Sequence, residues 1–118
     1  MLYFGIVITN ITMAIPDTEK NNVWSQLKSK NLLQAFLSLK TETEAKSFLR
    51  DLMTEKEIVE FDMRWTVANL LNQGVSFIDI EKQTGATPRT IARVSKWLQE
   101  GCGGYKEVIE RLKSNAKS

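Results

Sequence analysis

The chain has 118 residues, of which 42% are hydrophobic and 25% are charged, and these values are typical of a globular protein of one domain. It contains no histidine and a single cysteine, Cys102. These counts exclude a histidine-activated nucleophile, a histidine metal site and an intramolecular disulfide. The net charge of +2 is too small to indicate nucleic-acid binding, so the distribution of charge along the chain is more informative.

The N-terminal segment, residues 1–21, is predicted to be a poorly ordered arm. Residues 1–16 carry no charged side chain, but they lack the basic start of a signal peptide and are too short and too polar to span a membrane. Alternatively, they are an extension upstream of a true start at Met13. Residues 17–22 read as a polar linker. We therefore expect no membrane contact. The single cysteine is compatible with the reducing conditions of the cytoplasm.

Apolar residues at helical spacing predict three helices in the first two thirds of the chain. The first covers about Asn22–Leu39, the second begins at Thr41 and the third begins at Thr54 and ends at Gly74. A glutamate follows each threonine after three residues, which is the spacing of a capping box. The apolar stripe of the first helix is broader than one partner helix needs, which predicts a dimer.

The stretch from Ser76 to Leu98 has the pattern of two helices joined by a tight turn. Ser76 can cap the first helix, and Gly85 fits a left-handed residue at its end. Thr87 can cap the second helix, with Pro88 at its first position. This layout indicates a helix-turn-helix, whose second helix enters the major groove of DNA.

The second helix of this motif has a basic, hydroxyl-rich outer face without an acid between Pro88 and Gln99. The alternative interpretation is a helical hairpin within a bundle, with solvated arginine and lysine side chains. The C-terminal third of the chain is basic and residues 41–60 are acid-rich, which suits a protein with one DNA-facing side. The residues expected to contact DNA are Ser76, Thr87, Pro88, Arg89, Thr90, Arg93 and Lys96.

The remaining sequence gives no sign of catalysis. Gly101, Gly103 and Gly104 form a break, Tyr105–Leu112 is predicted to be a final helix, and residues 114–118 are expected to fray. No phosphate-binding loop or metal-ligand cluster is visible. The acidic residues near the third helix are interpreted as helix-start charges and solvated faces. We therefore predict no enzymatic activity, no metal and no cofactor.

These features resemble the Trp repressor superfamily, and in particular the small Trp-repressor-like proteins of the YerC/YecD type. The match covers about Val23–Leu112 and is carried by the segments Leu32–Leu39, Phe48–Ile58, Arg64–Trp65, Thr84–Leu98 and Gly103–Tyr105. The resemblance implies an all-α fold of six helices over residues 22–113, in which two chains interlock as a homodimer. It also implies a bacterial DNA-binding regulator.

The resemblance further implies a place for an effector. Trp repressor holds tryptophan between two arginines, and Arg93 matches the second of them. The first aligns with Trp65, with Arg64 one residue before it, and Val94 replaces a glycine that makes room for the ligand. We therefore interpret Arg64, Trp65, Arg93 and Val94 as a candidate effector pocket that Trp65 and Val94 fill, which argues against tryptophan as the effector.

Together these observations predict a cytoplasmic, homodimeric transcription factor. It would bind double-stranded DNA sequence-specifically through the helix Pro88–Leu98 and act as a repressor. One alternative is a protein-interaction module that keeps the fold without binding an operator. Another is a sensor for a small-molecule effector other than tryptophan.

Overall fold

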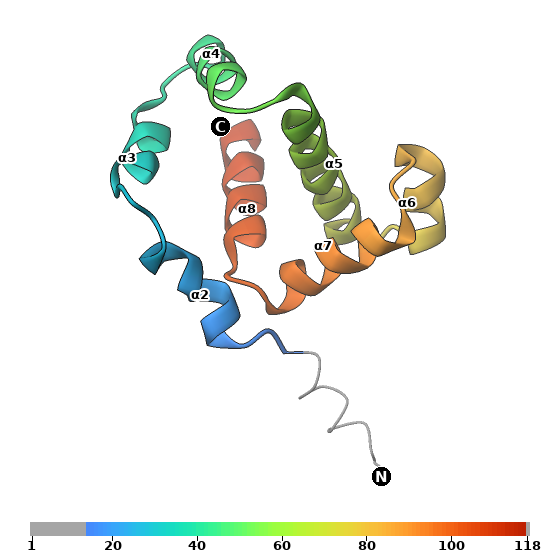
Figure 1. The fold of residues 1–118 in the computed structure, drawn as a ribbon. Coiled ribbons are helices and arrows are strands. Elements are labelled where there is room, and N and C mark those ends of the chain that lie inside the picture. The colour runs from blue at the N-terminus through green and yellow to red at the C-terminus, as the bar shows by residue number, and fades with distance from the viewer. Residues whose placement is uncertain (1–13, 118) are drawn as a thin grey trace.

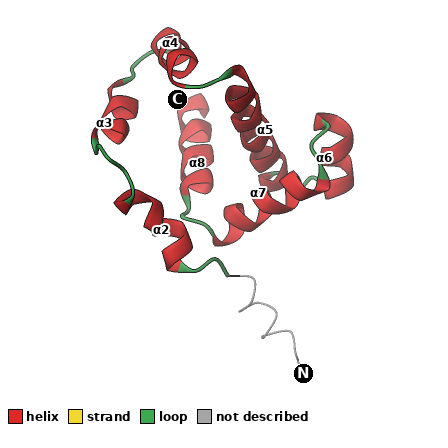
Figure 2. Cartoon of the chain, in the orientation of Figure 1, coloured by secondary structure: helices red, strands yellow, loops and turns green. Residues whose placement is uncertain are grey.

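The structure is a computed structural model that describes residues 14–117, and within this range it contains seven helices and no strand (Figures 1 and 2). The predicted all-α class is therefore confirmed. The helices are α2 (Asp17–Ser25), α3 (Asn31–Ser38), α4 (Glu42–Leu52), α5 (Glu55–Asn72), α6 (Phe77–Thr84), α7 (Pro88–Glu100) and α8 (Gly104–Lys117).

Helices α5 to α8 form the packed body of the molecule. The long helix α5 packs against α6, α7 and α8, while α2, α3 and α4 follow one another in an arc on one side (Figure 1). The apolar side chains that α6 and α7 bury in this body are Ile80, Ile91, Val94 and Leu98. The core cluster of this body is at most 5% exposed and consists of Val67, Ala68, Ile80, Ala86, Ile91 and Val94.

The start of α5 is fixed by a complete capping box. The Thr54 hydroxyl accepts a hydrogen bond from the Glu57 N–H at 3.1 Å, and the Glu57 carboxylate accepts one from the Thr54 N–H at 2.9 Å. The second box predicted, at Thr41, is only half formed. Thr41 accepts from the Glu44 N–H, but the Glu44 carboxylate accepts from the N–H of Lys40 instead.

The single first helix predicted over Asn22–Leu39 is wrong, because the structure has two helices separated at residues 26–30. The Ser25 hydroxyl donates to the Asn22 carbonyl at 2.8 Å, and the Ser29 hydroxyl accepts from the Asn31 N–H at 3.1 Å. These serine side chains compete with the helical hydrogen bonds of the backbone. The apolar spacing continues across the break and therefore conceals it.

The predicted arm and polar linker also need correction where the structure describes them. Helix α2 begins at Asp17, so residues 17–22 are helical rather than a linker. Asp17 and Glu19 lie in its first turn, where negative charge is favourable. Ile15, just before the helix, is only 4% exposed. The rest of the arm, residues 1–13, lies outside the described residues.

The last helix is longer than Tyr105–Leu112, since α8 continues to Lys117. Two ion pairs on its exposed side support the extension. Arg111 lies 3.5 Å from the Glu107 carboxylate and Lys113 lies 3.7 Å from that of Glu110. Such pairs add a few tenths of a kcal/mol each to a helix. Among the described helices, none has the length and apolar character needed to cross a membrane.

Candidate nucleic-acid interface

The turn between α6 and α7 is held by its own side chains. Ser76 caps α6 by accepting from the Asp79 N–H at 3.2 Å, as predicted. Gly85 ends the helix with φ of +75°, a left-handed conformation that side chains disfavour. Thr84, which the sequence interpretation missed, donates to the Ile80 carbonyl at 2.7 Å and accepts from the Ala86 N–H at 3.0 Å. These bonds set the angle between the two helices.

The first turn of α7 is organised by two threonines. The Thr87 hydroxyl accepts from the Thr90 N–H at 3.2 Å and donates to the Thr90 hydroxyl at 3.1 Å. Pro88 occupies the first helical position, as predicted. The Thr90 hydroxyl keeps its own proton for another acceptor. The helix therefore begins at a fixed residue and presents a hydroxyl at its N-terminal end.

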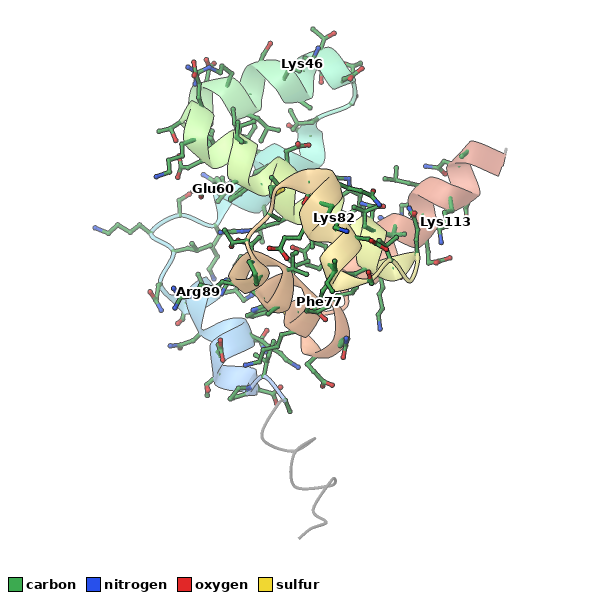
Figure 3. All side chains as sticks on the ribbon, turned by 90° about the vertical axis from the view of Figure 1, so that its right-hand side faces the viewer. Lys46, Glu60, Phe77, Lys82, Arg89 and Lys113 are labelled. Carbon is green, nitrogen blue, oxygen red and sulfur yellow. The ribbon has the colours of Figure 1, made fainter. Side chains whose placement is uncertain are left out.

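Helix α7 has two distinct faces. Ile91, Val94 and Leu98 are buried in the body, whereas Arg89, Arg93 and Lys96 are exposed. Figure 3 looks onto this part of the molecule and labels Arg89 on α7 with Phe77 and Lys82 on α6. Within residues 14–117 none of the three exposed cations forms an ion pair. Their charge is available to an external anionic partner.

The predicted effector residues are only partly brought together. A hollow of about 210 Å³ lies between α5, α7 and α8 and is lined by Arg64, Arg93, Val94, Trp97 and Tyr105. Trp65 is not among these residues and stacks on Tyr105 instead, with ring centroids 6.4 Å apart. Adjacent residues of a helix point about 100° apart, so only one of Arg64 and Trp65 can face the hollow.

Trp97 is therefore the tryptophan that lines the hollow with both arginines, in the place where the sequence led us to expect Trp65. Sequence reasoning could have found Trp97 from its spacing, because it lies one helical turn after Arg93 on the same helix. Arg64 is half-buried and its guanidinium lies 5.6 Å from the ring centroid of Phe61.

A larger apolar groove of about 760 Å³ adjoins the hollow. Its lining is mainly aromatic and aliphatic and comes from α3, α5, α7, α8 and the loop before α8. The residues are Phe36, Phe61, Trp65, Trp97, Cys102, Gly104, Tyr105 and Val108. Over residues 14–117 there is no group of three or more side chains placed to hold a metal ion.

The fold and this interface define a class: an all-α domain with a capped helix-turn-helix whose second helix exposes a basic face. Comparison with known proteins gives the family. The model of the Trp repressor protein family matches residues 27–113, and the chain belongs to this family, which comprises regulators rather than enzymes. The resemblance inferred from the sequence is confirmed.

Similar proteins come from several bacteria. The uncharacterized protein YerC of Bacillus subtilis is 38% identical over 91 residues, which cover 75% of this chain and 88% of YerC. A TrpR-like protein from Eubacterium eligens has a solved structure with a TM-score of 0.71 and 40% identity, covering 75% of this chain and 95% of that one. The structure of a candidate Trp repressor from Staphylococcus aureus matches with a TM-score of 0.69 and 31% identity. The match covers 84% of this chain and 96% of that one.

Proposed function

We propose that the protein is a homodimeric transcriptional repressor of the bacterial cytoplasm that binds double-stranded DNA sequence-specifically, with α7 in the major groove. The observation that carries this proposal is the division of α7 into a buried apolar face and an exposed face. The exposed face has Arg89, Arg93 and Lys96 and no acid before Glu100.

The exposed residues have different roles in the proposed complex. Arg89 lies in the first turn of α7, where an arginine can form two hydrogen bonds to the edge of a guanine. The N–H of Arg89 and the hydroxyl of Thr90 can bind a backbone phosphate, whereas Pro88 has no N–H and the Thr90 N–H is bonded to Thr87. Lys96 lies two turns further along and is expected to contact phosphate, which positions the helix without reading sequence.

The dimer is proposed from the apolar surface that residues 14–117 of one chain leave uncovered. Helices α2, α3 and α4 contain no buried residue, and the adjoining groove of about 760 Å³ is lined by aromatic side chains. Apolar surface of this extent is normally covered by a partner. A second copy supplies the matching apolar helices, in keeping with interlocked chains. The dimer would carry two reading helices, one from each copy, and would therefore require a DNA site made of two half-sites.

The test is selection of DNA fragments by the wild type from a random pool, followed by affinity measurements on the enriched site and on random DNA. For Arg89→Ala we expect the difference in binding free energy between the enriched site and random DNA to fall by about 1–3 kcal/mol, because contacts to base edges are what distinguish one sequence from another. For Lys96→Ala we expect binding to both DNAs to weaken by a similar factor.

The control is Lys46→Ala, which replaces an exposed lysine on α4 (Figure 3) and should change neither the affinity for the enriched site nor that for random DNA. If both α7 variants bind like the wild type, a protein-interaction module becomes the better interpretation.

A second candidate function, a sensor of an effector other than tryptophan, is favoured by the hollow that Arg64 and Arg93 line together. Calorimetric titration with tryptophan tests the exclusion of the family ligand. Val94 is 1% exposed and Trp97 occupies the neighbouring wall, so we expect no micromolar binding by the wild type. The same titration on Val94→Gly asks whether added space alone restores a site. Micromolar binding of tryptophan to the wild type would contradict the steric argument.

A further inference from the structure

Trp97 is the residue of α7 that lines both the hollow and the apolar groove. On one side it lines the hollow with Arg64 and Arg93, and on the other it lines the apolar groove. Tyr105 of α8 also lines both, so these two aromatic side chains separate the arginines from the groove. The indole therefore lies where α5, α7 and α8 meet.

The turn after α7 leaves room for this ring. A Cβ atom added to Gly101 would first overlap the backbone carbonyl oxygen of Trp97, and it would also lie 2.8 Å from Cε3 of the Trp97 indole, closer than packed carbon atoms approach. The glycine thus allows the indole to lie directly against the connection between α7 and α8. A larger residue at 101 would force a shift of the last turn of α7, of the indole, or of both.

Trp97 is nevertheless outside the core that folds the body. It is half-buried, and it does not belong to the cluster of fully buried residues around Ile80, Ile91 and Val94. Truncation of Trp97 should consequently leave the helix-turn-helix folded. What it removes is the side chain that fixes the C-terminal half of α7 against α5 and α8.

We propose that the indole of Trp97 is a built-in positioning group, which holds the reading helix in its DNA-binding orientation without a small-molecule effector. This inference rests on the proposed function. Helix α7 is continuous from Pro88 to Glu100, so a tilt at the end that carries Trp97 also moves Arg89 and Thr90 at the other end. Contacts to base edges tolerate little displacement. If the helix is free to tilt, only the fraction of molecules with the correct orientation can bind DNA, and the apparent affinity falls by that fraction.

The experiment removes the ring and then returns it as a free molecule. Trp97→Ala should lower affinity for the selected DNA roughly 5- to 150-fold, the usual range for coupling between two sites. Millimolar indole should restore most of this affinity, because apolar cavities made by truncation bind aromatic molecules of matching size. Wild type should show no response to indole. DNA affinity is read from fluorescence anisotropy well below the melting temperature, and indole binding from calorimetry.

The matched control is Leu98→Ala, the next residue on the same helix, which is 8% exposed and faces the body. It should lower stability but keep DNA affinity, and it should not respond to indole. Trp97→Phe, which keeps a ring, should bind DNA nearly as the wild type does. If Trp97→Ala does not fold, Trp97→Leu replaces it, with the same direction of change expected.

Three outcomes overturn the inference: unchanged DNA affinity in the Trp97 variants, a loss that indole does not reverse, or an equal loss in Leu98→Ala. Failure of the proposed function is recognised separately. In that case the wild type itself selects no DNA from the random pool, and the inference falls with it.

Discussion

Helices α3 and α7 are both amphipathic, yet the structure uses their apolar faces in opposite ways. Helix α7 buries Ile91 and Val94 in the body, at 0% and 1% exposure. Helix α3 buries no residue, and Leu33 and Leu37 remain 49% and 84% exposed. An aromatic contact of α3, between Phe36 and Phe48 of α4, lies within the same uncovered arc.

The difference shows that residues 14–117 supply enough apolar surface for a core around α5 to α8, while the apolar faces of α2 to α4 stay uncovered within this range. The body can be folded by contacts within one chain. The arc of α2, α3 and α4 has apolar faces that no contact among residues 14–117 buries, and in the proposed dimer a second copy covers them. Stability of the two regions should accordingly depend on different things: the body on its core residues, and the arc on protein concentration.

The largest effect is expected from a change in the core of the body. Ile91→Ala should lower the free energy of unfolding by about 2–5 kcal/mol, because the side chain is fully buried and its loss leaves a cavity. Ile78→Ala on α6, where the residue is 65% exposed, should cost less than about 0.5 kcal/mol. Urea denaturation of both variants measures the difference. Equal losses would mean that the body is not organised around the core described.

A change in the arc should act on association instead. Leu37→Glu places a charge where we expect a second copy to cover α3, and burial of an unpaired charge costs several kcal/mol. At 1.4 kcal/mol for each factor of ten, the dimer dissociation constant should rise at least about a hundredfold. The same substitution at the exposed Ile78, outside the arc, should leave association unchanged.

Sedimentation at micromolar concentration is the measurement. The wild type should sediment as two chains and Leu37→Glu should shift toward one, while Ile78→Glu stays with the wild type. A well-folded wild-type monomer at this concentration would contradict the dimer. It would also mean that the exposed apolar arc exists in solution without a cover.

The helix-turn-helix could be predicted from the sequence because its determinants are local. Ser76, Gly85, Thr87 and Pro88 each act on backbone groups within a few residues, so their spacing alone fixes both helix ends. The break between α2 and α3 is also local, but the apolar periodicity runs across it. The hydrogen bonds of Ser25 and Ser29 lie at this break, one in the last turn of α2 and one at the first residue of α3.

The candidate effector pocket was harder because it depends on distances between helices. Arg64 and Arg93 come from α5 and α7, and whether Arg64 or Trp65 faces Arg93 depends on the rotation of α5 about its axis. An alignment uncertain by one residue therefore exchanges the two. Tyr105 enters the same hollow from α8, whose position no pattern in the sequence specifies.

The smallest effect is expected at the start of α5, which is the boundary between the body and the arc. The Thr54 N–H and then its hydroxyl bond to the Glu57 carboxylate and hold the pKa of Glu57 below its ordinary value of 4.5. Because the folded-state pKa is lowered, the charged carboxylate contributes stability above the ordinary pKa, and this contribution is lost as pH falls through the folded-state value. Glu57 is fully exposed, so the effect should be modest.

Glu57→Gln keeps an acceptor for the Thr54 N–H but removes the charge, so it separates the hydrogen bond from its pH dependence. At neutral pH the variant should unfold at a slightly lower urea concentration than the wild type. As pH is lowered below 4.5, the two midpoints should converge, because wild-type Glu57 becomes protonated in both folded and unfolded states. Urea midpoints measured across this range give the answer. The prediction fails if the variant loses stability in acid as steeply as the wild type, so that the difference between their midpoints stays constant. The charge of Glu57 would then contribute nothing to the capping box at Thr54, and the start of α5 would be stabilised by packing of the body alone.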